Sequence, residues 1–371
     1  MKEKLLTSFL FAAVFIALAS AAMASTTWYV NGVSGNDGNG CISATTACKT
    51  VGHAISLATS GDSVKVAAAT YTENLTISIN LKILGSSAKT TILNGGGAGR
   101  VVTISSPAHV TLSGVTITNG NLGLGAGAGI GNGGVLTLLR SAVSGNRVKL
   151  SCTTCFPVEG GGIFNGTGAS LTVGNSTVSD NHVSLSGCLR SCSAKGGGIY
   201  NLGALTLYNS TISGNTASPY GQGNGSGIYT ESPGTAIIQS STLGGNGGSG
   251  AATIWGTAAL QNSIVADNGS SNCAGAVTSN GYNLSSDATC NFNHTGDLNN
   301  TDPSLGSLQY NGGPTKTMAL PSGSPAVDAG SPNGCTDGLG HLLKNDQRGK
   351  PRPDAEDTGG CDMGAYERQS D

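Results

Sequence analysis

Apolar residues in the middle of the chain follow a periodic pattern that is repeated several times. The phrase GGGIYNLGALTLYNSTISGN at 196–215 has close relatives at 160–181 and 225–246. Five copies align on the anchor positions Arg140, Asn175, Asn209, Ser240 and Asn262. Apolar residues stand four positions before, two before and three after each anchor. The three apolar columns are Leu136, Leu171, Leu205, Ala236 and Ala258; Leu138, Val173, Leu207, Ile238 and Leu260; and Val143, Val178, Ile212, Leu243 and Val265. A spacing of two predicts strands that bury one face.

The repetition predicts a stack of similar coils. Successive anchors are 35, 34, 31 and 22 residues apart. We interpret the shortest spacing as one bare coil, and the longer spacings as coils that add a loop at the same corner. Apolar columns that recur from coil to coil bury one continuous core. The chain is therefore predicted to be all-β, a single-stranded right-handed parallel β-helix (a solenoid) of about nine coils.

The segments on either side of the repeat differ from it and predict three further parts. Residues 1–24 are predicted to be a signal peptide, 25–61 an N-terminal cap, 62–291 the parallel β-helix, and 292–371 a charged C-terminal cap. A short amphipathic helix is expected over 50–58, where it would cover the open end of the first coil. Repeat stacks need such caps, because bare strand edges favour aggregation.

An asparagine stands six positions after every anchor. The column is Asn146, Asn181, Asn215, Asn246 and Asn268. Asparagine tolerates the left-handed backbone of a sharp corner, and its amide can bond to the amide one coil away. We therefore expect a structural ladder of side-chain amides. The NST sequences at Asn175 and Asn209 leave glycosylation as the alternative use of asparagine in these phrases.

The N-terminus predicts export from the cytoplasm. A positively charged start and an apolar run over 9–19 precede the small-x-small site Ala22-Met23-Ala24. This order is typical of a signal peptide, so the mature chain is expected to begin at Ser25 and to be secreted or displayed on the cell surface. The apolar run is too short to span a bilayer, and no transmembrane segment is expected after cleavage.

All ten cysteines lie in the expected mature chain, and an even number in an exported protein predicts disulfides. Proximity in the sequence suggests the pairs Cys41–Cys48, Cys273–Cys290 and Cys335–Cys361. The other four lie in the long loops, in the phrases CTTC and CLRSC. These four are Cys152, Cys155, Cys188 and Cys192. Disulfides within or between the loops are favoured over a zinc site of four thiolates, because thiols are oxidised outside the cytoplasm.

The overall charge of the chain argues against nucleic-acid binding. The formal net charge is −2, charged residues make up 10% and aromatic residues 5%. A nucleic-acid binder needs a basic face or aromatic platforms for bases, and the chain offers neither. Polysaccharide or another component of a cell surface is the expected partner of an exported rod.

Carboxylates are too sparse in the repeat to mark a catalytic centre. A calcium-dependent polysaccharide lyase needs several carboxylates within a few ångströms of one another. Asp180 and Asp267 share a column but lie three coils apart, about 14 Å at one strand spacing per coil. Glu159 and Lys195 share a column on adjacent coils and are expected to form a surface ion pair. No catalytic, cofactor-binding or metal-binding residue is therefore assigned.

The tail of the chain is the region richest in charge. Asp346, Arg348, Asp362 and Glu367 are expected to form an ion-pair lattice that closes the last coil within the Cys335–Cys361 clasp, with a calcium site as the alternative. The phrase GNDGNG at 35–40 is too short for a calcium loop and is expected to be a Gly/Asn turn.

Two sets of phrases carry a resemblance to known exported proteins. The GGGI(F/Y)N and SGN phrases are similar to the repeats of chlamydial polymorphic outer membrane proteins. The tail DPSLGSLQYNGGPTKTMALPSGSPAVDAG…NDQRGKPRP…CDMGAYE resembles the choice-of-anchor Q region of bacterial surface proteins. The chain as a whole resembles exported bacterial right-handed parallel β-helix proteins of pectin lyase-like fold. This resemblance implies sorting or surface display and assigns no activity.

Three functions remain open from the sequence. The expected one is non-enzymatic adhesion or glycan binding by the long loops, which line one edge of a rigid rod. Deleting residues 147–159 and 183–195 should then abolish binding and leave the fold intact. A polysaccharide lyase or glycoside hydrolase is the alternative, and a purely structural envelope protein is the third reading.

Overall fold

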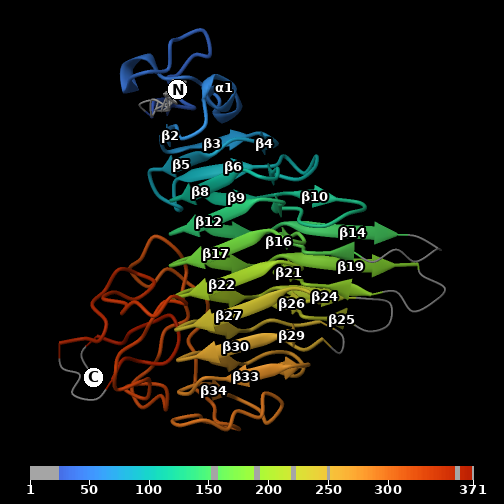
Figure 1. Cartoon of the computed structure of the whole chain (residues 1–371), viewed down its shortest axis with the longest axis vertical. Helices are drawn as coiled ribbons and strands as arrows, with labels where there is room; N and C mark the ends of the chain where they lie inside the picture. Colours follow the sequence, from blue (N-terminus) through green and yellow to red (C-terminus); the bar gives the residue numbers. More distant parts are fainter. Residues whose placement is uncertain are drawn as a thin grey trace, which may run out of the picture.

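The computed structural model describes residues 25–151, 158–187, 193–218, 223–248, 251–355 and 360–369, so the predicted signal peptide lies outside the described residues. Figure 1 shows a rod of stacked coils with the N-terminal residues at one end. Each full coil contributes one strand to each of three long sheets, and neighbouring strands are parallel. The predicted all-β parallel β-helix is confirmed.

The three long sheets form the walls of the rod. Sheet A contains β1 (Thr27–Val30), β2 (Ser63–Val66), β5 (Leu81–Gly85), β8 (His109–Ser113), β12 (Val135–Leu139), β17 (Ser170–Gly174), β22 (Ala204–Tyr208), β27 (Thr235–Gln239), β30 (Ala258–Gln261) and β33 (Val277–Ser279). Sheet B contains β3 (Ala69–Thr72), β6 (Thr91–Asn94), β9 (Thr116–Thr118), β13 (Ala142–Ser144), β18 (Thr177–Ser179), β23 (Thr211–Ser213), β28 (Thr242–Gly244), β31 (Ile264–Ala266) and β34 (Leu284–Ser285). Sheet C contains β4 (Leu75–Ile77), β7 (Val102–Ile104), β11 (Ile130–Asn132), β16 (Ile163–Asn165), β21 (Ile199–Asn201), β26 (Ile228–Thr230), β29 (Ile254–Gly256) and β32 (Cys273–Ala274).

The predicted apolar columns form the core inside these walls. The strand register places Leu136, Leu171, Leu205, Ala236 and Ala258 side by side on successive coils. All five side chains are buried, as are those of the other two columns. Burying a leucine or isoleucine side chain stabilises the fold by about 1.5–3 kcal/mol, so the core is a stack of similar contributions along the rod.

The N-terminal segment both joins and covers the rod. Strand β1, which falls in the segment predicted as a cap, is the first strand of sheet A. The short helices η1 (Ala44–Thr46) and α1 (Val51–Leu57) follow it. Helix α1 packs against β1, β2 and β4, with Val51 and Ala54 buried. The Glu73 carboxylate accepts hydrogen bonds from the first two backbone N–H groups of α1, which stabilises that helix end.

The left-handed backbone at the corners of the coils belongs to other residues than the expected asparagine column. The five anchor residues all adopt left-handed backbone, with φ between 46° and 51°. The ladder asparagines are not among the residues of positive φ; the residue before each of them is, as in Gly145 and Asp180. The prediction that the asparagine column needs a left-handed backbone is therefore wrong. The asparagines act through their side chains.

The asparagine side chains form a buried chain of amides. Each Nδ2 donates to the Oδ1 of the asparagine on the next coil, at 3.0, 3.0, 3.0 and 3.3 Å from Asn146 to Asn268. The same Oδ1 also accepts the backbone N–H of the preceding asparagine. Two further ladders were not anticipated from the sequence. They are Asn132, Asn165 and Asn201, and Ser141, Ser176, Ser210, Ser241 and Ser263.

The long loops have a small core of their own, which the sequence did not predict. Sheet D contains β10 (Asn121–Leu122), β14 (Arg147–Ser151), β19 (His182–Ser186) and β24 (Thr216–Ser218); sheet E contains β15 (Val158–Glu159), β20 (Ala194–Lys195) and β25 (Gly223–Asn224). Both sheets contribute to one apolar cluster. Its buried members are Ala128, Val148, Val158, Val183, Leu185, Ala194, Ala217 and Ala251. We call sheets D and E together with this cluster the outgrowth.

The C-terminal tail (residues 298–355 and 360–369) begins beside the last strand of sheet B, where Leu298 pairs with Leu284, and then runs back along the flank of the rod (Figure 1). The outward hydroxyls of Thr177 and Thr211 donate to the tail residues Lys316 and Gln347, and that of Thr242 accepts the backbone N–H of Ala365. These three threonines are at most 1% exposed. The tail lies on sheet B because the outward threonines of that sheet supply hydrogen-bond partners on successive coils.

Candidate functional site

Six of the ten cysteines assigned from the sequence form disulfides in the described residues. Disulfides join Cys41 to Cys48, Cys273 to Cys290 and Cys335 to Cys361. The described residues contain one group with metal-ligand spacing, Cys41, Cys48 and His53, and its two cysteines are bonded to each other. Disulfides of this kind are typical of proteins outside the cytoplasm. Cys152, Cys155, Cys188 and Cys192 lie outside the described residues.

The predicted ion-pair lattice is present in the tail, with one member the sequence analysis missed. Arg348 Nε lies 2.7 Å from Asp346 Oδ2, and Arg352 Nε lies 2.6 Å from Glu367 Oε2 in a fully buried pair. Arg352 also donates to Asn209 Oδ1 at a corner of the rod. The lattice therefore fastens the tail to the coils. Asp362 accepts the backbone N–H groups of Asp328 and Arg368, so its carboxylate has a structural use as well.

The other acidic residues considered from the sequence are dispersed or occupied. Asp180 and Asp267 follow β18 and β31, which are three strands apart in sheet B. Asp37, in the GNDGNG phrase, accepts the backbone N–H groups of Lys49 and Thr50 and the Thr50 hydroxyl. Its carboxylate therefore stabilises the turn before α1.

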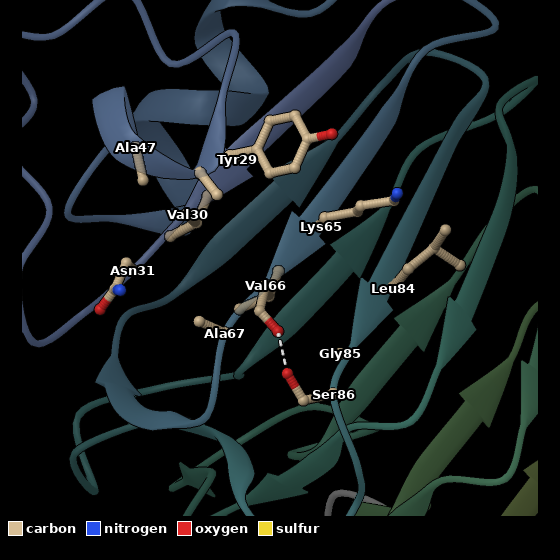
Figure 2. Close-up of a pocket in the computed structure, with 11 residues that line it drawn as sticks. Tyr29, Val30, Asn31, Ala47, Lys65, Val66, Ala67, Leu84, Gly85 and Ser86 are labelled. Carbon is tan, nitrogen blue, oxygen red and sulfur yellow. Dashed lines mark hydrogen bonds between the residues drawn. The ribbon is translucent and has the colours of Figure 1, made fainter.

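A pocket of about 350 Å³ lies on the outward face of sheet A near the N-terminal end of the rod (Figure 2). Tyr29, Lys65 and Leu84 come from β1, β2 and β5, and the strand register places them side by side. The Lys65 ammonium lies 5.7 Å from the centre of the Tyr29 ring, within range of a cation–π contact. The disulfide-closed loop that contains Ala44 and Ala47 forms one wall.

The polar groups of this pocket differ in how they are used. Ser86 Oγ donates to the Val66 carbonyl, as drawn in Figure 2, and Asn31 Oδ1 accepts two backbone N–H groups of its own turn. Four salt bridges join residues of the described ranges, and none includes Lys65. Lys65 is exposed and Tyr29 is half-buried. The pocket thus offers a cation and an aromatic side chain to a ligand, above a rigid apolar floor.

Two more hollows follow the first along the outward face of sheet A. The second, about 290 Å³, lies over β5, β8 and β12 and includes Lys82 and His109. The third, about 130 Å³, lies between Tyr208 and the tail residues 337–339. A column of half-buried threonines connects the second and third hollows. It consists of Thr111, Thr137, Thr172 and Thr206. From β1 to β22 the row spans roughly 30 Å at one strand spacing per coil.

A separate cluster of charged and aromatic side chains lies where the outgrowth meets sheet C. The rings of Phe164, Tyr200, Tyr229 and Trp255 stack on successive strands, with centroids 5.5–6.3 Å apart. Lys195 Nζ lies 2.9 Å from Glu231 Oε2 and 4.9 Å from the centre of the Tyr229 ring. The Tyr200 hydroxyl donates to Glu231.

The expected ion pair between Glu159 and Lys195 is replaced by this one. Glu159 and Lys195 are neighbours in the register of β15 and β20, as expected, but the salt bridge of Lys195 goes to Glu231. Glu231 also accepts from Tyr200, and this second donor favours the charged carboxylate there. Sequence reasoning missed Glu231 and Tyr200 because neither stands in the column that Glu159 and Lys195 share.

The two carboxyl groups of this cluster are shifted in opposite directions. Burial raises the pKa of Glu159, and the nearby Glu231 carboxylate adds to that effect. Burial also acts on Glu231, but hydrogen bonds from Tyr200 and Lys195 outweigh it and lower the pKa of Glu231. Burial and the neighbouring carboxylates raise the pKa of the Tyr200 hydroxyl. One acid is therefore easier to keep protonated than the other, a combination that acid–base chemistry uses.

Comparisons with known proteins give a weak likeness in shape. No family model and no curated protein matches the chain. A solved structure, the crystal structure of pectate lyase Pel9A, is similar to it with 14% sequence identity and a TM-score of 0.36, over 93% of this chain and 97% of that one. So low a TM-score carries no argument about activity. In the part of the chain that the structure describes, no helix has the length and apolar character needed to cross a membrane.

Proposed function

We propose that the protein is an exported, non-catalytic carbohydrate-binding rod that holds an extended polysaccharide along the outward face of sheet A. The observation that carries this proposal is the row of three hollows along the outward face of sheet A, the third of which is bordered by the tail. A linear polymer fits such a row because each unit meets a similar environment as it passes from coil to coil. Surface display follows from the same proposal, since a rod that binds glycans is of use outside the cytoplasm.

The chemistry of the row supports a sugar as the occupant. Threonine side chains offer a hydroxyl that both donates and accepts, beside a methyl group that packs on apolar ring faces. Tyr29 and Tyr208 add aromatic surface at the two ends, and Lys65, Lys82 and His109 add donors. The strands fix these side chains in advance, so little conformational entropy is lost on binding.

Retention on immobilised polysaccharides, followed by titration with soluble oligosaccharides, tests the proposal. Changing Tyr29→Ala together with Lys65→Gln should weaken binding by roughly tenfold, since an aromatic contact and a charged donor are both lost. Lys49→Gln is the matched control, because Lys49 is also an exposed lysine near the N-terminal end but does not line the pocket. Equal affinities for the double variant and the control would contradict the proposed face.

The outgrowth is the competing surface, because the long loops were the expected place of binding. The deletions of 147–159 and 183–195 remove β14, β15, β19 and β20, and with these strands much of the apolar cluster of the outgrowth. If binding survives in a folded deletion variant, sheet A holds the ligand; if binding is lost while Tyr29→Ala has no effect, the outgrowth does.

A second candidate function rests on the cluster in which Lys195 and Tyr200 bind Glu231 beside Glu159, and in which the pKa of Glu159 is raised and that of Glu231 lowered. In a glycoside hydrolase, a protonated carboxylic acid donates its proton to the glycosidic oxygen while a carboxylate attacks or activates water at the anomeric carbon. Glu159 has the environment of the acid and Glu231 that of the carboxylate. Release of reducing ends that disappears in Glu159→Gln and Glu231→Gln would establish this activity. Absence of release by the unaltered protein across neutral and acidic polysaccharides would rule it out.

A further inference from the structure

A fourth hollow lies between sheet B and the tail. It has a volume of about 190 Å³, and its wall is the outward face of β6, β9, β13 and β18. Small and hydroxyl side chains make up this wall: Thr116, Ala142, Ser144, Thr177 and Ser179. The opposite side is formed by the tail, with Tyr310, Thr315 and Lys316. A pocket of this size takes a single small polar unit, such as one sugar ring.

Two lysines from distant parts of the chain meet at one exposed ring in this pocket. The Lys89 ammonium lies 4.5 Å and the Lys316 ammonium 6.0 Å from the centre of the Tyr310 ring, and Tyr310 is 49% exposed. Lys89 and Lys316 take part in none of the salt bridges among the described residues. Both ammonium groups therefore border the same ring, and an anion bound beside that ring is attracted by both of them.

The tail side of the pocket is held in place before any ligand arrives. Gln347, which is 1% exposed, donates to Thr177 Oγ1, to Thr315 Oγ1 and to the Lys316 carbonyl. Thr177 donates to the same carbonyl. These buried bonds fix the backbone on either side of Lys316 against β18. Ordering the Lys316 side chain on binding therefore loses less conformational entropy than ordering a lysine on a free loop would.

We propose that this pocket binds an anionic sugar unit, a hexuronate whose carboxylate is held by Lys89 and Lys316 and whose ring packs beside Tyr310. The half-buried Ser144 hydroxyl and the exposed Asp180 carboxylate complete the site by bonding to sugar hydroxyls. This inference rests on the proposed function in that it names the class of glycan, but its residues belong to a different face from the row on sheet A. The carboxylate-bearing unit is favoured over a neutral one because the pocket holds two cations against one anion.

Digalacturonate and its dimethyl ester form a matched pair of probes, because esterification removes the charge and leaves the sugar backbone unchanged. Isothermal titration of the unaltered protein should show the acid binding more tightly than the ester. The double variant Lys89→Gln and Lys316→Gln should weaken binding of the acid by about tenfold, leave the ester unchanged, and remove most of the dependence on salt. Lys49→Gln again serves as the control. Heteronuclear NMR shifts that centre on Tyr310 would place the ligand, and Tyr310→Ala should weaken both probes.

The outcomes separate this inference from the proposed function. Equal affinity for acid and ester, or an acid affinity that the double lysine variant does not change, overturns the hexuronate site. Loss of digalacturonate binding in Tyr29→Ala with Lys65→Gln, and not in the Lys89 and Lys316 variant, would place the acid on sheet A instead. Sulfated dextran tests the nature of the anion: binding as tight as that of the uronate would overturn the assignment to a carboxylate.

Discussion

Asp62 is buried between the first strands of sheet A, where it gathers four hydrogen bonds. Its carboxylate accepts the backbone N–H groups of Thr26 and Thr59, the Trp28 indole N–H and the Thr59 hydroxyl. Burial alone would raise the pKa of Asp62, but these donors outweigh it and hold the pKa below its ordinary value. A single carboxylate therefore joins β1 to the turn before β2.

Asp62→Asn should lower the free energy of unfolding by about 1–3 kcal/mol at pH 7. The amide NH₂ group of asparagine would then point at N–H and O–H donors and leave some of them without an acceptor. The folded-state pKa is lowered, so the stabilisation is present above the unfolded value near 3.9 and is lost as the pH falls through the folded value. Urea unfolding at pH 7 and pH 3 measures this. The gap between variant and parent should narrow at pH 3, and a gap of the same size at both pH values would contradict the argument.

At the scale of a structural element, the asparagine ladder makes each corner depend on its neighbours. Asn181 Oδ1 accepts from both the backbone and the side chain of Asn146, and Asn181 is fully buried. Asn268, the last residue of this column, is only half-buried, and its amide donates on to Asn272 Oδ1. Water can therefore replace lost partners at Asn268 but not at Asn181.

Asn181→Ala should destabilise the rod by roughly 2–4 kcal/mol, because it leaves two buried N–H groups of Asn146 without an acceptor. Asn268→Ala is the matched control at a half-buried position and should cost clearly less. Thermal unfolding of the two variants, each confirmed as folded by circular dichroism, gives the comparison. Equal losses of stability would show that the ladder does not act through its buried bonds.

The same elements show how far the sequence predicts the molecule. Columns such as Leu136, Leu171 and Leu205 were predictable because near-identical phrases set the register and burial repeats with a period of two. The hollows were not predictable, because the outward-facing residues that line them do not follow a burial pattern that repeats along the sequence. Tyr29, Lys65 and Leu84 become neighbours only through stacking, and Lys89 meets Tyr310 only because the tail folds back. Glu159 and Lys195 were placed correctly as neighbours, yet the partner of Lys195 depends on the Tyr200 hydroxyl, which a one-dimensional alignment does not locate.

At the scale of the whole molecule, the tail connects coils that otherwise contact only their immediate neighbours. Its contacts with Thr177, Thr211, Thr242 and Asn262 reach four successive coils. The Cys335–Cys361 disulfide closes a segment of the tail with a sequence separation of 26, against 7 for Cys41–Cys48. A longer closed loop removes more entropy from the unfolded chain.

Replacing Cys335 and Cys361 by serine should therefore cost about 3.5 kcal/mol, and replacing Cys41 and Cys48 about 2.5 kcal/mol. Unfolding in guanidinium chloride measures the two losses. The first replacement should also increase hydrogen exchange in β18, β23 and β28, which the tail covers, while the second should act near β1. Unchanged exchange in those sheet B strands would show that the disulfide does not hold the tail in place.

The position of the tail also has a mechanical consequence. A solenoid whose coils touch only their neighbours peels from its free end one coil at a time, so that a pulling force meets one weak interface after another. Here the tail is attached to four successive coils. A force that pulls on the C-terminal coils is therefore shared by all four attachments, and we expect these coils to unfold together.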